Sequence, residues 1–234
     1  MYQGFEIKYS DRITEDKERQ DIEVKAERLI NKYMEKLLKG NEHLGTGLKA
    51  EVFSLVESSI CVKIIVKPDL CFNNVEQELK LMDKLYAGGI NIPRPLGAAY
   101  SIDHKVSLLF MERVNGSSVE DFLLDKNLTE LPQGFEVEKF FASLQKQVNK
   151  MHEVLGIHHR DLHAGNVMID VDGQPWIIDF DKSTEHYFAN EDPYIQATIP
   201  GHYEKLPQDN HLIKEMKKDA IKHFSKEKEG NINV

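Results

Sequence analysis

The sequence predicts an α+β protein built from two lobes, the first rich in β-strands and the second helical. Its 234 residues are 41% apolar and 29% charged, which is typical of globular proteins, and the length is sufficient to bury a core. Short β-rich segments dominate from residue 41, whereas helical spacing of apolar residues dominates after residue 117. Turn-forming residues collect between these patterns, at 115–117. We therefore expect a helical extension, a β-rich lobe and a helical lobe at 1–40, 41–114 and 115–234, with 41–225 forming one domain.

Charge and cysteine content exclude several classes of protein. The 39 acidic residues outnumber the 30 basic ones, and the formal net charge of −9 argues against a broad nucleic-acid-binding surface. The longest run without a charged residue, 193–203, has eleven residues and is too short to span a bilayer. The N-terminus lacks the pattern of a signal peptide, and Cys61 and Cys71 form no CxxC pair. We expect a cytoplasmic protein without a transmembrane segment, a disulfide framework or a zinc site.

The N-terminal segment predicts one long helix at 14–39. Thr14 is suited to cap its start, and Gly40 is suited to end it. Apolar residues recur between them at helical spacing, at Ile22, Ala26, Leu29, Tyr33 and Leu37. We interpret this stripe as a packing surface, with a partner-binding role as the alternative.

The first lobe is predicted from short apolar segments bounded by turn residues. We expect β-structure near 43–48, 52–56, 60–66 and 106–114. Among these segments, 73–87 has helical spacing and ends at Gly88 and Gly89. Pro93, Pro95 and Gly97 are expected to break up the stretch before the last strand.

The second lobe is predicted to be mainly helical. We expect helices at 119–124, 136–155 and 210–225, the last capped by Asp209 or Asn210. Two short strands, near 167–169 and 176–178, are expected to form a hairpin around the turn Asp172–Gly173.

The most informative segment is 159–166, which reads His-Arg-Asp-Leu-His-Ala-Gly-Asn. Asp179 and Phe180 follow, with Asp179 thirteen residues after Asn166. Together these residues resemble the protein-kinase-like superfamily, whose pattern is H-R-D-L-x-x-x-N and then Asp-Phe. In that chemistry one Asp must reach the hydroxyl that attacks the γ-phosphorus, while an Asn and a second Asp hold Mg²⁺ on the phosphates. A loop followed by a hairpin is able to bring three such side chains together.

Further parts of the pattern occur upstream in the expected order. Residues 45–53 resemble the glycine-rich loop, although Ala50 replaces its third glycine. Lys63, at the end of Ile-Cys-Val-Lys, resembles the lysine that pairs with the α- and β-phosphates. Glu78 fits the helical glutamate that orients this lysine better than Glu76 does. The segment 111–114 resembles the hinge whose backbone binds adenine, so that the resemblance spans 44–181.

The resemblance implies a bilobal protein-kinase-like fold with a truncated helical C-lobe, and it implies ATP and Mg²⁺ as cofactors. Its catalytic residues would be Asp161, Lys63, Asn166 and His163, and its metal ligands Asn166 and Asp179. The residues expected at the nucleotide are Gly45, Thr46, Gly47, Val52, Lys63, Glu78, Glu112 and Val114. His159 is expected to be structural, and a metal-binding role for Asp181 is left open. Asp179 lies among apolar neighbours, where burial of its charge is costly unless it meets a metal or a donor.

Several positions depart from the protein-kinase pattern. His163 stands where Ser/Thr protein kinases usually carry a lysine, and a histidine at this position resembles small-molecule phosphotransferases. Two roles are considered for it: contact with the transferring phosphoryl group, or a hydrogen bond to the loop backbone. Asp181 replaces the glycine of Asp-Phe-Gly, which resembles lipopolysaccharide-core sugar kinases such as Kdo kinase. Only 53 residues follow Asp181, as in compact RIO and Bud32-type kinases. Arg160, in contrast, is typical of protein kinases rather than small-molecule kinases.

Three functions remain open from the sequence. The first is an ATP- and Mg²⁺-dependent phosphotransferase that acts on a hydroxyl, with a Ser/Thr of a protein as the preferred acceptor. The second is a kinase for a sugar or another small molecule. The third is a nucleotide-binding scaffold without turnover, which the retention of Lys63, Asp161, Asn166 and Asp179 disfavours. The acceptor and the oligomeric state are not predicted.

Overall fold

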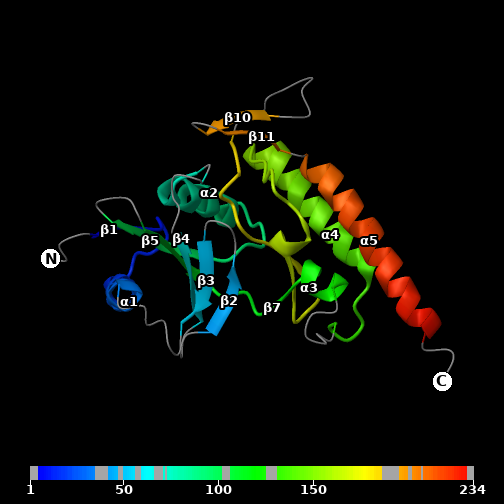
Figure 1. Ribbon diagram of the computed structural model, residues 1–234, viewed down its shortest axis with the longest axis horizontal. Coiled ribbons are helices and arrows are strands. Elements are labelled where there is room, and N and C mark those ends of the chain that lie inside the picture. The colour runs from blue at the N-terminus through cyan, green and yellow to red at the C-terminus, as the bar shows by residue number, and fades with distance from the viewer. Residues whose placement is uncertain are drawn as a thin grey trace. The chain divides into compact units, whose positions relative to one another are not determined.

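The computed structural model describes two compact units (Figure 1). The first unit extends to Ala87 and resumes at Pro93–Arg113, and the second contains Gly88–Ile92 and resumes at Val114. The described residues are 5–34, 42–46, 50–55, 59–65, 71, 73–101, 106–124, 131–185, 195–199, 202–206 and 208–230.

The first unit contains a six-stranded sheet in which all neighbouring strands are antiparallel. The order across the sheet is β1-β5-β6-β4-β3-β2. The strands are β1 Phe5–Tyr9, β2 Glu42–Thr46, β3 Ala50–Ser54, β4 Ile60–Ile65, β5 Pro95–Ser101 and β6 Ser107–Glu112.

The core of this unit forms around the two central strands, β4 and β6. Five of the six residues of each strand are buried, so both faces of these two strands are covered. Val62, Leu108 and Phe110 are among the core residues, and Ile13 and Ile22 from the N-terminal segment join the same cluster. The strands predicted near 60–66 and 106–114 are therefore present within one residue or two of the expected limits.

Strand β5 differs from the sequence-based expectation, because Pro95 and Gly97 do not interrupt it. Pro95 is the first residue of the strand, where the lack of an N–H group is tolerated. Gly97 follows an irregularity in the pairing with β6, and a Cβ atom there would lie 2.8 Å from the carbonyl oxygen of Lys8. Glycine is therefore needed at this position so that β1 can approach β5.

The first forty residues contain more than the expected helix. Strand β1 pairs along the edge of β5, with Tyr9 opposite Gly97. Helix α1 covers Asp16–Met34, inside the predicted range. Arg94 links this helix to the sheet, because its guanidinium lies 2.7 Å from Glu18 and 2.9 Å from Glu112. The described part of the extension is thus an integral part of the first unit.

Helix α2, Val75–Ala87, packs a buried face against the sheet. Asn74 and Gln77 cap its start reciprocally, since each backbone N–H donates to the side-chain oxygen of the other residue, at 3.0 and 2.9 Å. The buried face consists of Val75, Glu78, Leu79, Leu81, Met82 and Leu85. Glu78 is the one charged residue in this set, and a buried carboxylate requires a partner that compensates its charge.

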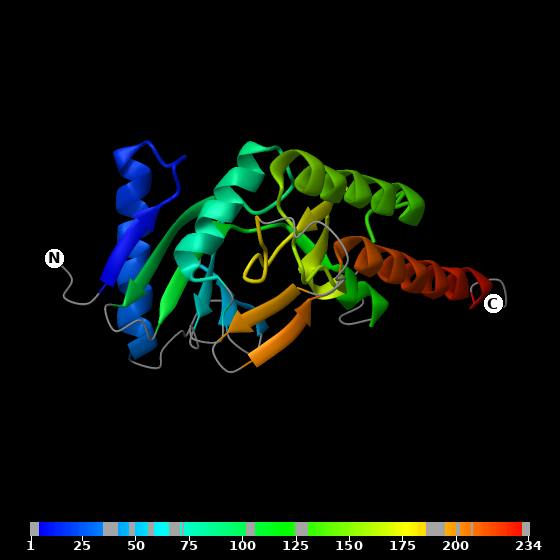
Figure 2. The same cartoon turned by 90° about the horizontal axis from the view of Figure 1, so that it is seen from above.

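The second unit combines helices with two small sheets. One sheet has three strands in the order β7-β8-β9, and the other is the β10–β11 hairpin. The helices α4 and α5 lie side by side (Figures 1 and 2). The elements are β7 Gly116–Ser118, α3 Val119–Leu123, α4 Val137–Lys150, β8 Val167–Asp170, β9 Pro175–Ile177, β10 Ile195–Ile199, β11 His202–Leu206 and α5 Asp209–Gly230.

The predicted helix at 136–155 consists of two parts. α4 is followed directly by a π-helical turn, Met151–Leu155, which ends at Gly156 with a φ of 67°. π-turns of this kind are frequent near functional sites, and this one leads into the segment that begins at Ile157. The strands β10 and β11 were not predicted from the sequence. No helix in the described ranges combines the length and apolar character that crossing a bilayer requires.

Candidate active site

Lys63 and Glu78 form a buried ion pair in the first unit. The Lys63 Nζ atom lies 2.8 and 3.0 Å from the two carboxylate oxygens of Glu78. Lys63 is 7% exposed and Glu78 is 1% exposed, whereas Glu76 is only partly buried. A buried charge is costly without a partner, so the pair fixes Lys63 between β4 and α2. The structure thus brings Lys63 together with Glu78 rather than with Glu76.

The other predicted nucleotide-binding residues of this unit lie on β2, β3 and β6. Gly45 pairs with Val52 across β2 and β3, and no atom lies within 4 Å of the place where a Cβ atom would stand. Val52 in turn lies opposite Lys63. Thr46 is the last residue of β2, and Gly47 lies outside the described residues.

Glu112 ends β6, at the position predicted for the hinge. Its backbone N–H donates to the Arg94 carbonyl at 3.0 Å, and its carbonyl oxygen accepts a hydrogen bond from the Cys61 thiol, whose sulfur lies 3.8 Å away. Burial raises the pKa of the Cys61 thiol to about 12, so the thiol stays neutral. Val114 is the first residue of the second unit after this strand.

In the second unit, Asp161 and Asn166 are joined through the backbone of the loop between them. The Asn166 Nδ2 atom donates to the Asp161 carbonyl at 2.9 Å, and the His163 N–H donates to the same carbonyl at 2.9 Å. The short 3₁₀ turn Ala164–Asn166 then leads into β8. This hydrogen bond orients the Asn166 side chain, and Oδ1 is the atom of the amide that is able to bind a cation.

Asp179 is held near the loop 161–166 by a backbone hydrogen bond of the preceding residue, Ile178. The Ile178 N–H donates to the Asn166 carbonyl at 3.0 Å, and Phe180 is fully buried with its ring 5.0 Å from that of His159. Asp179 itself has a φ of 66°, a strained conformation for a residue other than glycine. An amide oxygen and a carboxylate are the ligand types that Mg²⁺ prefers, so Asn166 and Asp179 fit this ion.

His159 is fully buried and has a structural role. Its Nε2 atom lies 2.9 Å from the Ile178 carbonyl, and its Nδ1 atom accepts the Asp161 N–H at 3.3 Å. Because a carbonyl only accepts, the ring carries its proton on Nε2 in this arrangement. The imidazole thus connects the loop to the segment that carries Asp179.

Asp209, which the sequence predicts only as a possible helix cap, contacts the same loop in the structure. It is 2% exposed, and its two oxygens accept the backbone N–H groups of His159 and Arg160, each at 2.7 Å. His152 Nε2 lies 2.8 Å from the same carboxylate. Burial alone would raise the pKa of Asp209, but the hydrogen bonds from His152 and from the His159 backbone N–H are among the effects that outweigh burial and lower the pKa. No pattern near residue 209 could have revealed contacts to a loop about fifty residues away.

His152, His158 and Asp209 also present ligand-type atoms within 4.8 Å of one another. The two imidazole rings are stacked, with their centroids 4.1 Å apart. The Asp209 oxygens already accept three hydrogen bonds from the described residues, so we interpret the cluster as a support of the loop rather than as a metal centre.

His163 lies over the backbone of its own loop. Its Nδ1 atom accepts the Gly165 N–H at 3.1 Å, and a Cβ atom at position 165 would lie 2.9 Å from His163 Cε1. Gly165 is therefore needed for this contact. Of the two roles considered for His163, the geometry favours hydrogen bonding to the loop backbone.

Lys182 is a second site residue that the sequence analysis did not single out. Its Nζ atom lies 3.3 Å from Asp161 Oδ2, and both side chains are mostly buried, at 15% and 23% exposure. The neighbouring Asp181 is 6% exposed. The carboxylate predicted to act on the acceptor thus has a lysine beside it.

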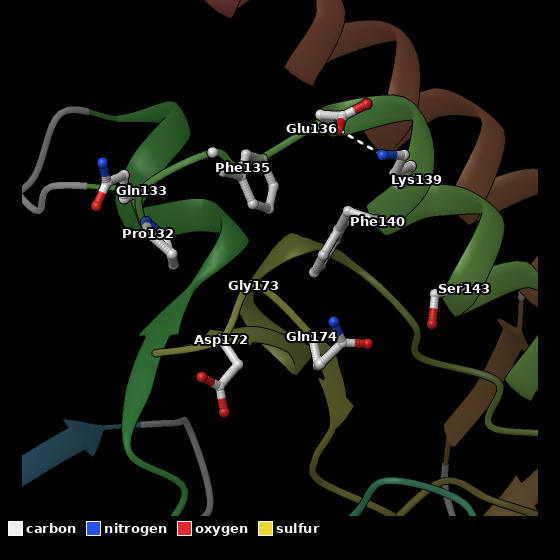
Figure 3. Close-up of a pocket in the computed structure, with 11 residues that line it drawn as sticks. Pro132, Gln133, Phe135, Glu136, Lys139, Phe140, Ser143, Asp172, Gly173 and Gln174 are labelled. Carbon is white, nitrogen blue, oxygen red and sulfur yellow. Dashed lines mark hydrogen bonds and ion pairs between the residues drawn. The ribbon is translucent and has the colours of Figure 1, made fainter.

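A pocket of about 280 Å³ lies at the other end of the β8–β9 hairpin (Figure 3). Phe135 and Phe140 flank it, and Glu136 and Lys139 form an ion pair at its edge. Five residues separate Asn166 from the hairpin turn at Asp172, and the four of them that form β8 span roughly 13 Å. None of the predicted site residues lines this pocket.

Comparisons with known proteins identify related sequences. The family model of the protein kinase domain matches residues 38–198. A 3-deoxy-D-manno-octulosonic acid kinase from Xylella fastidiosa strain 9a5c is 32% identical over 108 residues, which cover 45% of this chain and 39% of the relative.

Two further proteins with the same name come from Vibrio species. The one from Vibrio vulnificus is 36% identical over 109 residues, which cover 45% of this chain and 42% of the relative. The one from Vibrio parahaemolyticus is 30% identical over 126 residues, which cover 50% of this chain and 49% of the relative. The chain thus matches less than half of the length of each of these relatives.

Proposed function

This chain belongs to the protein kinase domain family, and from that premise we propose that it is an ATP-dependent kinase whose acceptor is a sugar hydroxyl. The observation that carries the phosphotransferase assignment is the hydrogen-bonded set of Asp161, Asn166 and the Ile178–Asp179 segment. It supports the assignment because hydroxyl activation and metal binding both require carboxylates held close to one another.

The sugar acceptor was the second choice in the sequence analysis, behind a Ser/Thr of a protein. The relatives that match this chain are named 3-deoxy-D-manno-octulosonic acid kinases, which favours the sugar. Asp181 supports the same choice, because Asp-Phe-Asp resembles the sugar kinases. A cytoplasmic location is part of the proposal, since the reaction consumes ATP.

The residues would divide the work as follows. Lys63, oriented by Glu78, binds the α- and β-phosphates through a buried ammonium group. Asn166 and Asp179 hold Mg²⁺, which supplies positive charge against the phosphates when it is bound. Asp161 orients the acceptor hydroxyl and accepts its proton.

The test is transfer of labelled γ-phosphate from ATP in the presence of Mg²⁺. The acceptors are 3-deoxy-D-manno-octulosonic acid, a neutral hexose and a mixture of unfolded proteins, and the products are separated by mass. We expect label in the sugar acid, and we expect Asp161→Asn to abolish it. Label confined to the protein fraction would return the assignment to a Ser/Thr kinase.

The non-catalytic alternative predicts a different result. A nucleotide-binding scaffold would bind ATP and transfer no label to any fraction. Calorimetry on the same preparation establishes that ATP binds, and an assay of ADP release then separates a scaffold from an enzyme that was offered the wrong acceptor. An enzyme still transfers the phosphoryl group slowly to water, and a scaffold does not.

A further inference from the structure

The ion pair between Lys182 and Asp161 places a positive charge directly beside the proposed acceptor-binding carboxylate. The distance between Lys182 Nζ and Asp161 Oδ2 is 3.3 Å, and the Lys182 side chain is 15% exposed. Surface lysines pair weakly because they remain solvated. Lys182 is largely withdrawn from solvent and lies at a functional carboxylate, so its position calls for an explanation beyond surface charge.

The backbone holds Lys182 in this position. The Ser183 N–H donates to the Phe180 carbonyl at 3.1 Å, which closes a turn with Lys182 near its middle. His158 and Thr184 then exchange two backbone hydrogen bonds of 2.9 Å, and Ser183 Oγ donates to the His159 carbonyl at 3.3 Å. The turn that carries Lys182 is therefore attached to the segment that leads into Asp161.

Phosphoryl transfer needs positive charge at the transferring group, because negative charge accumulates on its oxygens and on the attacking oxygen. His163 stands where a lysine would supply this charge in a protein kinase. Its Nδ1 atom accepts the Gly165 N–H, and an atom that accepts a hydrogen bond carries no proton. In this geometry the His163 ring is bound to the loop backbone, and position 163 offers no lysine ammonium group to the phosphoryl group.

We propose that Lys182 supplies the missing charge and is a catalytic residue that binds the transferring phosphoryl group beside Asp161. The inference rests on the proposed phosphotransferase function. In the reaction, the bond between the γ-phosphorus and the β–γ bridging oxygen breaks, and the acceptor oxygen bonds to the phosphorus. The acceptor proton goes to Asp161, while Lys182 keeps its proton and donates hydrogen bonds throughout. The ammonium group also offsets the repulsion between the Asp161 carboxylate and the phosphoryl oxygens.

A purely structural role, in which Lys182 only holds Asp161 in place, predicts different binding behaviour. A lysine that contacts the γ-phosphoryl group favours ATP over ADP even when Asp161 is replaced with Asn, whereas a lysine that acts only by holding or neutralising Asp161 loses this preference in the Asp161→Asn background. The deciding quantity is therefore the ratio of the affinities for AMP-PNP, a non-hydrolysable ATP analogue, and for ADP, each with Mg²⁺. This ratio is measured without turnover.

The variants are Lys182→Met, alone and combined with Asp161→Asn, together with Lys182→Arg and His163→Gln, and Lys218→Met is the matched control. Lys218 is 74% exposed on α5 and lies outside the proposed site. We expect Lys182→Met to weaken AMP-PNP binding by about 10- to 100-fold relative to ADP, as for the loss of a hydrogen bond to a charged group. Lys182→Arg should retain much of the AMP-PNP-to-ADP affinity ratio. His163→Gln and Lys218→Met should leave this ratio unchanged, and Lys182→Met should lower it in the Asp161→Asn background as well.

Two results would overturn the inference. One is an AMP-PNP-to-ADP ratio that Lys182→Met leaves unchanged, either in the wild-type background or in the Asp161→Asn background, with the fold intact by circular dichroism. The other is a ratio that falls in His163→Gln but not in Lys182→Met, which would assign the phosphate contact to His163. A wild-type protein that binds both nucleotides but transfers phosphate to nothing would contradict the proposed function, while the ratio would still decide the role of Lys182.

Discussion

The Asp209 carboxylate accepts the backbone N–H of Arg160 at 2.7 Å, across 49 positions of the chain. The contact joins the start of α5 to the residue before Asp161, the carboxylate proposed to act on the acceptor. Arg160 has a φ of 69°, which is strained for a residue other than glycine. A buried carboxylate that accepts hydrogen bonds on both oxygens stabilises such a conformation, so α5 helps to set the shape of the loop that carries Asp161.

Replacing Asp209 with Asn should therefore reduce both stability and activity. The amide nitrogen would face a backbone N–H that the carboxylate now accepts, so at least one buried donor would lose its partner. We expect the free energy of unfolding in urea to fall by about 2–3 kcal/mol. Asp219→Asn, at an exposed position of the same helix, is the control. Equal stability of the two variants would contradict the structural role of Asp209.

His158 should make the protein less stable in mild acid. Burial, together with the smaller effects of His152 and Arg160 and against the opposing effect of Asp209, lowers the pKa of His158 to about 4. An unfolded histidine titrates near 6.5, so between pH ~6.5 and ~4 the unfolded chain binds a proton that the folded chain does not. This contribution is complete above the window and is lost as the pH falls through it.

The corresponding measurement is urea unfolding at pH 7 and at pH 5. His158→Phe keeps a flat ring and removes the titration, so we expect its loss of stability between these pH values to be smaller than that of the wild type by about 2 kcal/mol. His211→Asn, at an exposed position, should behave like the wild type. Parallel pH dependence of wild type and His158→Phe would show that another group is responsible.

Lys63 and Glu78 should act as one unit in nucleotide binding and turnover. Lys63→Met should lower kcat/KM by about 10- to 100-fold, and Glu78→Gln should lower it less by leaving the ammonium group poorly oriented. The double variant should lose less than the sum of the two losses in free energy, because the residues share one interaction. Glu76→Gln is the matched control, and additive losses would mean that the pair is not functional.

Asp179→Asn should lose most of the turnover that Mg²⁺ supports, while its fold is preserved. The amide keeps the shape of the carboxylate but lacks the charge that a hard cation requires. We expect turnover to fall by roughly 100- to 1000-fold, corresponding to several kcal/mol of metal stabilisation. A titration with Mg²⁺ measures this, with the exposed Asp172→Asn as control. Comparable turnover of Asp179→Asn and wild type at saturating Mg²⁺ would refute the metal assignment.

Much of the fold was predictable because the signals lie within short windows of the chain. The apolar run in β4 and the helical spacing in α2 both follow from local patterns, and the structure has these elements close to the predicted limits. The strand β5 was missed because Pro95 and Gly97 disrupt most strands, and only the neighbouring β1 explains why glycine stands there. The strand β1 was missed because its partner lies some ninety residues away.

The sequence by itself determined the family pattern, since the spacing of Asp161, Asn166 and Asp179 is a property of the chain alone. Only the tertiary structure decided between Glu78 and Glu76, brought Lys182 to Asp161, and joined Asp209 to the loop. The physical reason is that a motif records which groups the chemistry requires. Burial and backbone hydrogen bonds between distant segments determine which carboxylate meets which cation. These contacts produce no periodic pattern of residues from which they could be predicted.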